Sequence, residues 1–454
     1  MYRIEDIEKI DANLNKIKDG AALEYKTFNE PTLNEMTNVV KVIKQYIVKN
    51  KKIVYGGFAQ NLLLINKNKE ESFYKEIDGV YFNWPDLADI EFYSENPIQD
   101  VINLTQELYN AKFNHVEGKE GVHPETYKIF VNFMNYCDIS YISPNIYRNM
   151  PIIEINGIRC THPHFMMVDA YRVLTDPMTS YWRLDKSIKR FQKILKYYPL
   201  DNSLLEKKYE FKSSQDILNK IRKNIIRNSK CIVVGFYAFN YYVKKYSNDY
   251  VLNNFPYYEI ISTNLEGDVN KIYNYLNKKY NNKITMKKFY PFTEFIDNRV
   301  EFYHDNNMVL RVFGSNNRCI VYNYSEKKQI YFGTYNLVFM YLLFNYFLFK
   351  INNHKYNIDL YSSLISKIST VKNKYLNEHK ITVIDKSPFQ DFTYKCFGKP
   401  VDMIRSSLLQ GLVNKSKGKR MKFRYEPSSK TSSTTNSSMS WIFDNSSGNQ
   451  KQKK

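Results

Sequence analysis

Residues 85–94 read PDLADIEFYS, and this stretch places two carboxylates, Asp89 and Glu91, in a run that otherwise has the character of a buried strand. Side chains two positions apart on a strand point to the same face, so the two acids are expected side by side. Like charges that are buried together repel each other and lose hydration. The pair therefore indicates either a site that holds a cation or the solvated face of an edge strand.

Two further features accompany this pair. The apolar run KKIVY (51–55) ends in Gly56-Gly57, and the helix-like run FAQNLLLIN follows. Glycines at such a place let backbone approach a phosphate, and the first N–H groups of a helix attract anions, although a diglycine also marks an ordinary tight turn. A third acid, Asp138, lies in another apolar strand, NYCDISYIS (135–143), where it would also suit a cap or a surface position.

The ordered set is more informative than its parts. Three carboxylates on neighbouring strands offer the hard oxygen ligands that Mg²⁺ prefers. Two such ions about 3.5–4 Å apart can hold the attacking and leaving oxygens of a phosphoryl displacement. The chain contains no GxxxxGK[ST] loop, no GxGxxG after a strand and no HExxH motif, which leaves nucleotidyl transfer as the phosphate chemistry that the residues support.

The charge of the chain favours a polyanionic partner, nucleic acid first. The formal net charge of the 454 residues is +20. Residues 183–230 hold 14 Lys or Arg against 5 Asp or Glu, and residues 415–454 hold 10 against 2. A basic tail can be a solubility device, but a basic stretch between two folded units is harder to explain in that way.

Cysteines and apolar runs bound the class of protein. The five cysteines are scattered without a CxxC pair, which argues against a zinc site and a disulfide framework and fits a reducing compartment. The polar start MYRIEDIEKIDANLNK does not have the pattern of a signal peptide. The most apolar run, 336–349, is shorter than a membrane span and contains an Asn, so we expect a buried helix there.

Periodicity predicts a mixed α/β chain. Residues 31–50 have helical spacing, residues 97–111 open with a proline at a helix start, and Asn156-Gly157 between apolar flanks predicts a hairpin. Residues 161–177 and 180–198 read as two further helices.

The second half of the chain repeats the first. KCIVVGFYAFN (230–240) matches KKIVYGGFAQN (51–61), residues 257–276 match residues 89–108, and VEFYHD (300–305) then parallels CDISYI (137–142). The sequence thus predicts a duplicated α/β unit.

The two copies differ at the residues that carry chemistry. Gly57 is replaced by Phe236 and Asp89 by Tyr257, whereas Glu91 keeps a counterpart in Glu259. A phenylalanine blocks the approach of a phosphate to the backbone, and the loss of one acid removes a metal ligand. We therefore expect chemistry in the first copy and a degenerate second copy.

The order of the segments IVYGGFAQN, DLADIEFYS and CDISYI resembles that in members of the nucleotidyltransferase superfamily. The segments more closely resemble those of the poly(A) polymerase catalytic subunits of large cytoplasmic DNA viruses (poxviruses, African swine fever virus and mimiviruses). The resemblance is clear over about residues 50–200 and holds in outline elsewhere. It implies two nucleotidyltransferase-like units of mixed β-sheets flanked by helices, the second degenerate, and a disordered tail. The predicted ranges are a helical segment 1–50, a catalytic domain 51–200, a basic linker 201–228, a degenerate domain 229–405 and a basic Ser-rich tail 406–454.

The resemblance also implies roles for individual residues. Gly56 and Gly57 would hold the triphosphate of ATP, Asp89 and Glu91 would ligate two Mg²⁺ or Mn²⁺ ions, and Asp138 would bind the ion that activates the 3′-hydroxyl of RNA. Two departures stand out: the gap of 32 positions from Gly57 to Asp89 is long, and Glu91 stands where a second Asp is commoner. Asp86 is the alternative to Asp89, disfavoured because only Asp89 and Glu91 keep the two-residue spacing.

The remaining expectations concern binding. Arg183 and Lys186 lie three apart in YWRLDKSIKR (181–190), so they line one helix face that either contacts nucleotide or primer phosphates or is simply solvated. The expected partners are an RNA 3′ end and ATP, with a homodimer or a separate processivity factor both open and no membrane. The resemblance places the work in viral factories of the host cytoplasm, with packaging into the virion compatible. The alternatives are uridylyl or CCA addition, or a non-catalytic RNA-binding or processivity subunit.

Overall fold

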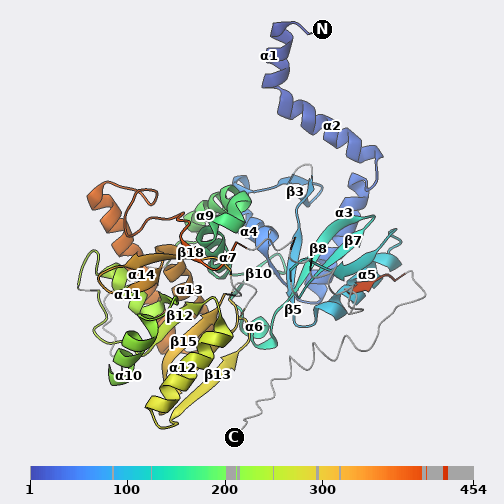
Figure 1. The fold of residues 1–454 in the computed structure, drawn as a ribbon. Helices are drawn as coiled ribbons and strands as arrows, with labels where there is room; N and C mark the ends of the chain where they lie inside the picture. Colours follow the sequence, from blue (N-terminus) through green and yellow to red (C-terminus); the bar gives the residue numbers. More distant parts are fainter. Residues whose placement is uncertain are drawn as a thin grey trace. The chain divides into compact units, whose positions relative to one another are not determined.

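The computed structural model describes residues 2–83, 86–123, 125–200, 211, 215–248, 250–292, 296–315, 318–400, 405, 409 and 423–427 (Figure 1). The chain forms two compact units, Met1–Thr161 with Ser407–Lys454, and His162–Ser406. The division falls inside the segment 51–200 that the sequence assigns to one domain, because the helix after Thr161 packs within the second unit. The predicted domain limits stay predictions.

The first unit is built on a mixed sheet in the order β19-β6-β7-β8-β5-β1-β10-β9. Its central pairs β5–β8 and β1–β10 are parallel and the others are antiparallel. The strands are β1 (Ile53–Tyr55), β5 (Ile90–Ser94), β6 (Glu117–Glu120), β7 (Thr126–Val131), β8 (Met134–Tyr141), β9 (Ile152–Ile155), β10 (Ile158–Thr161) and β19 (Arg424–Tyr425).

Helices complete the first unit. They are α1 (Ile4–Ala12), α2 (Leu14–Phe28), α3 (Leu33–Lys49), α4 (Gly56–Ile65), α5 (Pro97–Asn110) and α6 (Pro144–Asn149). The expected helices at 31–50 and 97–111 are confirmed as α3, which buries Met36, Val40, Ile43 and Ile47, and as α5, which is capped by Asn96. The insertion before β5 holds η1 (Lys69–Glu71) and a small separate sheet of β2 (Lys75–Ile77), β3 (Val80–Asn83) and β4 (Asp86–Leu87).

The second unit contains another mixed sheet, in the order β13-β14-β15-β12-β11-β17-β16-β18. Its strands are β11 (Ile232–Val234), β12 (Tyr258–Ser262), β13 (Ile284–Phe289), β14 (Arg299–His304), β15 (Asn307–Gly314), β16 (Ile320–Ser325), β17 (Ile330–Gly333) and β18 (Cys396–Phe397). Its helices are α7 (Pro163–Thr175), α8 (Pro177–Ser180), η2 (Tyr181–Arg183), α9 (Leu184–Tyr197), α10 (Gln215–Lys220), the π-helix η3 (Ile221–Ile226), α11 (Gly235–Val243), α12 (Leu265–Lys279), α13 (Tyr335–Ile351) and α14 (Lys355–His379).

The two sheets share their topology. Seven strands of the first sheet, in the spatial order β6-β7-β8-β5-β1-β10-β9, correspond one by one to β13-β14-β15-β12-β11-β17-β16 of the second. The parallel and antiparallel pairs are the same in both. Capping repeats as well, because Ser94 donates to Asp100 at the start of α5 and Ser262 donates to Asp268 at the start of α12. The structure therefore confirms a duplicated α/β unit.

One strand equivalence predicted from the sequence is wrong. β8, which carries residues 137–141, occupies the place of β15, so the counterpart of Asp138 is Arg311, whereas residues 300–304 lie in β14, the counterpart of β7. The error arose because both β14 and β15 are apolar strands beside each other in a hairpin, and their order in the sheet is invisible to spacing.

Two other expectations need correction. Cys319 and Cys396 form a disulfide with a Cα–Cα distance of 5.4 Å, since β18 pairs with β16 directly after Cys319. Their separation of 77 residues hid this proximity from the sequence. Within the tail expected to be disordered, Arg424 and Tyr425 form β19 on the edge strand β6. The other residues of 406–454, apart from 409, 423, 426 and 427, lie outside the described part of the chain.

The most apolar helix is buried rather than membrane-spanning. α13 buries most of its residues, and Phe347 and Phe339 of α13 contact Phe165 and Tyr171 of α7 at ring-centroid distances of 5.1 and 4.8 Å. In the part of the chain that the structure describes, no helix has the length and apolar character needed to cross a bilayer.

Candidate active site

A row of four side chains crosses the first sheet in register. Tyr55 on β1 faces Glu91 on β5, Glu91 faces Asp138 on β8, and Asp138 faces Lys128 on β7. Directly opposed residues on neighbouring strands project from the same face of a sheet. Two of the three predicted carboxylates are thus next to each other on adjacent parallel strands, although they are 47 positions apart in the chain.

The other face of these strands belongs to the core. Phe92 alternates with Glu91 along β5, is fully buried, and contacts Tyr46 of α3 at a ring-centroid distance of 6.3 Å. The helices α3 and α5 pack together and α5 packs on β6, β7 and β8. Because the apolar face anchors the strands, the acidic face is held in place without being covered by these two helices.

The first glycine of the pair is fixed by Glu91. Gly56 has a φ of +66°, and a Cβ at this position would collide with Oε2 of Glu91. The N–H of Gly57 donates to the same oxygen at 3.1 Å. The diglycine therefore serves both as a left-handed bend and as a place where the start of α4 meets an anionic oxygen, in line with the attraction of helix N-termini for anions.

Asp138 is held by two donors. Lys128 Nζ contacts Oδ1 and Oδ2 of Asp138 at 2.8 and 2.6 Å, and Asn135 Nδ2 donates to Oδ1 at 3.0 Å. The side chains of Lys128 and Asp138 are 30% and 18% exposed, so this ion pair is half-buried, with access to water.

The charge of the third acid, Asp89, acts on the same buried thiol, Cys137, as the charges of the other two acids. Asp89 directly precedes β5 and is exposed. Burial raises the pKa of the Cys137 thiol well above its ordinary value, and the charges of Asp138, Glu91 and Asp89 raise this pKa further, while Lys128 acts in the opposite direction.

The donor chemistry fits a divalent cation. The three carboxylates supply hard oxygen ligands, two of them on directly paired residues, as expected for Mg²⁺ or Mn²⁺. Among the described residues, no three His, Cys, Asp or Glu side chains stand in a position to hold a metal ion. The ion pair with Lys128 engages both oxygens of Asp138, which gives a physical reason for this result.

The other candidates lie elsewhere. Asp86 belongs to β4 in the small three-stranded sheet and not to β5. Arg183 and Lys186 lie in η2 and α9 of the second unit, where the guanidinium of Arg183 stands 4.5 Å over the ring of Trp182. Asn61 is fully buried and accepts from Ser72 Oγ and Phe73 N at 3.0 and 2.7 Å.

Two histidines at the start of the second unit, His162 and His164, have structural partners. His162 accepts from His164 N at the start of α7, and His164 Nε2 lies 2.8 Å from Tyr198 O. Burial lowers the pKa of His162 to about 4 and lowers the pKa of His164 as well.

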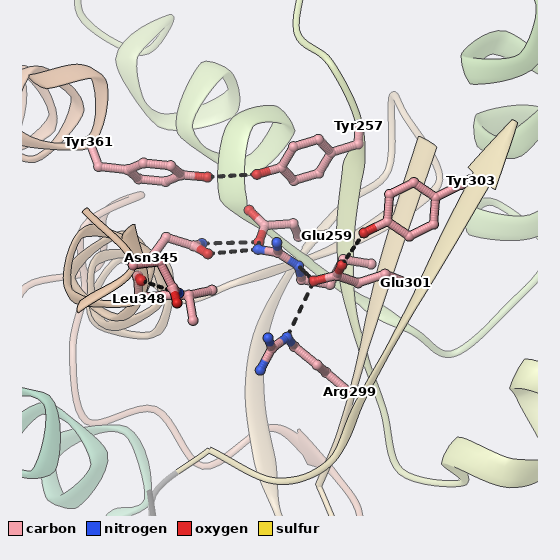
Figure 2. A network of polar contacts seen from close by, with 10 residues as sticks. Tyr257, Glu259, Arg299, Glu301, Tyr303, Asn345, Leu348 and Tyr361 are labelled. Carbon is pink, nitrogen blue, oxygen red and sulfur yellow. Dashed lines mark hydrogen bonds and ion pairs between the residues drawn. The ribbon is translucent and has the colours of Figure 1, made fainter. Parts of the chain in front are cut away.

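In the second unit an ion-pair network occupies the equivalent place. Glu259 faces Arg311 across β12 and β15, as Glu91 faces Asp138. Arg311 NH1 lies 3.0 Å from Glu259 Oε1, and its Nε lies 2.9 Å from Glu301 Oε1. Asn345 also donates to Glu259, and Tyr257 pairs with Tyr361 (Figure 2).

This network explains why the second copy is degenerate. Glu259 is 0% exposed and Arg311 is 4% exposed in their side chains, so a guanidinium permanently neutralises the carboxylate that remains. Gly235 repeats the bend of Gly56 with a φ of +63° against Glu259, and the buried Phe236 follows it.

Lys128 and Arg311 are the cations of these two rows, and sequence reasoning missed both. Lys128 stands in TYKIFV, and Arg311 in NMVLRVFG, each the only charged residue in a strand of apolar and small polar residues. A single basic residue in an otherwise uncharged strand could have drawn attention to each of them. The acid with which each one pairs can be identified only from the strand register.

Comparisons with known proteins identify the family to which the chain belongs. Residues 41–180 match the family model described as "Poly(A) polymerase catalytic subunit", and residues 192–453 match "APMV, Putative poly(A) polymerase, catalytic subunit, C-terminal". The chain is 29% identical over 465 residues to the "Putative poly(A) polymerase catalytic subunit" of Acanthamoeba polyphaga mimivirus, covering 94% of this chain and 78% of that protein. The protein of the same name from African swine fever virus (isolate Tick/Malawi/Lil 20-1/1983) is 26% identical over 46% of this chain and 42% of its own.

A solved structure is similar along almost the whole chain. The crystal structure of the Megavirus polyadenylate synthase has a TM-score of 0.87 and 29% identity, and covers 98% of this chain and 90% of its own. With family models that match both units in order, the chain belongs to the poly(A) polymerase catalytic subunit family.

Proposed function

We propose that this protein extends the 3′ end of viral mRNA with adenylate, as a template-independent nucleotidyltransferase that consumes ATP. The observation that carries the proposal is the register of Glu91 and Asp138 beside the Gly56 bend, in a chain of this family. The 3′-hydroxyl oxygen forms a bond to the α-phosphorus of ATP, the bond from that phosphorus to the bridging oxygen of the β-phosphate breaks, and pyrophosphate leaves. The RNA gains one AMP in each cycle.

Asp89, Glu91 and Asp138 would hold two Mg²⁺ or Mn²⁺ ions, with Asp138 on the side of the RNA hydroxyl. Such ions neutralise the developing phosphate charge and favour the ionised hydroxyl. No nucleophilic side chain is needed, since the chain itself positions the reactants. Gly56 and Gly57 fit a triphosphate because a side chain at Gly56 would collide with Glu91, so only a bare backbone stands at this bend.

The second unit supports the reaction without performing it. Its equivalent row also contains two carboxylates, Glu259 and Glu301, but both contact the buried guanidinium of Arg311, which would repel a divalent cation. Arg183 and Lys186 remain candidates for contacts to the triphosphate or to primer phosphates, because both are cations on a strongly basic segment.

Partners and place of work follow from the proposed reaction. RNA 3′ ends and ATP are the substrates, and a homodimer or a separate processivity factor are both compatible with the chain. The relatives named above are proteins of a mimivirus and of African swine fever virus. For this chain we propose work in viral factories of the host cytoplasm, with packaging into the virion compatible.

Primer extension with purified protein tests the proposal. An unstructured RNA primer is incubated with Mg²⁺ and each NTP separately, and we expect long products with ATP. Asp89→Ala and Asp138→Asn should each lower the extension rate by at least a hundred-fold while the protein stays folded. Asp86→Asn is the matched control, because Asp86 is exposed and lies on the other sheet, and it should keep the wild-type rate.

The outcomes separate the alternatives. Preference for UTP, or for CTP followed by ATP, would reveal uridylyl or CCA addition. RNA binding with no metal-dependent extension by any NTP would identify a non-catalytic subunit. Wild-type extension by Asp89→Ala would reject the site assignment itself.

A further inference from the structure

We propose that Lys128 is a built-in competitor of the divalent cation at Asp138, so that it sets the metal affinity of one half of the site. The inference rests on the proposed function, because it concerns the metal that Asp138 would bind. It assigns a positioning role to a residue that no sequence motif singled out.

Lys128 occupies both carboxylate oxygens of Asp138. Its Nζ reaches both oxygens of Asp138, at 2.8 and 2.6 Å, and no other carboxylate is recorded as its ion-pair partner among the described residues. A carboxylate that is bonded on both oxygens by an ammonium group has to loosen this pair before it can ligate a metal ion. Lys128 and a cation therefore compete for the same two oxygens.

The strand register places Lys128 and Glu91 on opposite sides of Asp138. Lys128 and Asp138 are opposed on β7 and β8, so the ammonium stands on the far side of Asp138 from Glu91. Charge along the row is positive, negative and negative. Without Lys128, the neighbouring carboxylates of Asp138 and Glu91 would repel each other with no compensating cation in the row.

The second unit supplies an internal comparison. The same register pair is present there with its charges exchanged, Glu301 on β14 and Arg311 on β15. Arg311 is only 4% exposed and stays locked between two carboxylates, whereas Lys128 is 30% exposed on a flexible side chain. The ion pair of Lys128 and Asp138 can therefore open toward water and release Asp138 to a metal ion, whereas the ion pair of Arg311 and Glu301 cannot open.

Competition of this kind has a functional consequence. The Asp138 half of the site would bind its cation weakly in the free protein and fill when substrate phosphates add their negative charge. The other half, near Asp89 and Glu91, lies further along the row from Lys128 and would be less affected.

Direct metal titration of the full-length protein tests the inference. Mn²⁺ binding without nucleotide is followed by electron paramagnetic resonance of the free ion and by calorimetry. Lys128→Met keeps the length of the aliphatic stem and should lower the dissociation constant of the weaker site about ten-fold, equivalent to about 1.4 kcal/mol. Lys128→Arg keeps the charge and should stay within about two-fold of wild type, and Lys128→Gln serves as a second neutral variant.

Each outcome has one meaning. Unchanged or weaker Mn²⁺ binding in a folded Lys128→Met or Lys128→Gln protein would overturn the competition, as would equal tightening by Lys128→Arg. Asp138→Asn is included in the same titration and should abolish the weaker site. If Asp138→Asn leaves Mn²⁺ binding intact, the site assignment of the proposed function fails, whatever Lys128 does.

Discussion

Replacing Arg311 by methionine should destabilise the second unit strongly and leave the first unit intact. Arg311 is the cation that joins Glu259 and Glu301, at 3.0 and 2.9 Å, and it also donates to Asn345 Oδ1 at 2.7 Å. The methionine side chain fills much of the same volume, so the substitution mainly removes charge. Glu301 keeps Arg299 at 3.3 Å, but Glu259 keeps only the amide of Asn345.

The size of this destabilisation depends on how deeply Glu259 and Arg311 are buried. The side chains of Glu259 and Arg311 are 0% and 4% exposed, and removal of one partner from a buried ion pair costs about 3–5 kcal/mol because the remaining charge is uncompensated. Asp138→Asn changes the equivalent position in the first unit. It should alter stability by less than about 1 kcal/mol, since that ion pair is partly exposed.

The loss should depend on pH with a defined sign. Burial already raises the pKa of Glu259 in the wild type, and loss of Arg311 raises it further because the main opposing charge is gone. A carboxylate with a raised pKa in the folded state stabilises the fold below its unfolded pKa, and this contribution is lost as the pH rises through the folded value. The destabilisation by Arg311→Met should therefore be smaller at pH 5 than at pH 8.

Hydrogen exchange with mass spectrometry resolves the two units separately. Peptides that cover β12 and β15 should exchange about a hundred-fold to a few thousand-fold faster in Arg311→Met at pH 8, and peptides that cover β5 and β8 should not change. Adding Glu259→Gln to Arg311→Met should recover part of the loss by removing the unpaired charge. A loss below about 1 kcal/mol, or equal acceleration in both units, would refute the reasoning.

Three further predictions concern other parts of the chain. Gly56→Ala should cost about 1–3 kcal/mol and abolish primer extension, because φ is +66° and the new methyl group meets Glu91, and thermal unfolding with the extension assay would show both effects. Burial raises the pKa of Asp391 to about 6, so the stability that its neutral carboxyl contributes is lost as the pH rises through this value. Asp391→Asn should therefore reduce the fall in unfolding free energy between pH 4 and 7 by about 1–3 kcal/mol. Urea unfolding at several pH values measures this fall, and the same fall in wild type and variant would contradict the prediction. Deletion of residues 423–454 should expose the edge of β6, so that the amide of Glu120, which donates to Phe423 O at 3.0 Å, loses protection in hydrogen exchange, while the amide of Glu91 keeps it.

Local features were predictable from the sequence. The helix α3 follows from apolar spacing over 31–50, and the start of α5 follows from Pro97. The hairpin between β9 and β10 follows from Asn156-Gly157, whose φ values are 49° and 78°. Each depends on residues within one turn or one hairpin, where the physical preferences of side chains act directly.

Features that depend on distant pairing were not predictable in this way. The counterpart of Asp138 was placed in β14 instead of β15, and the Cys319–Cys396 disulfide and the strand β19 were missed. In each case, two segments meet because a sheet brings them together. Shifting a strand by one residue turns every side chain to the other face, and single-sequence patterns do not fix that shift.

The sequence by itself determined that the chain is a duplicated α/β protein and which acids of the first copy are candidates for phosphate chemistry, because hydrophobic period and turn residues act over short range. Only the tertiary structure decided which charges face one another: Lys128 against Asp138 in the first unit, and Arg311 between Glu259 and Glu301 in the second. Electrostatic interaction depends on distance in space, and strand pairing sets that distance for residues that are far apart in the chain.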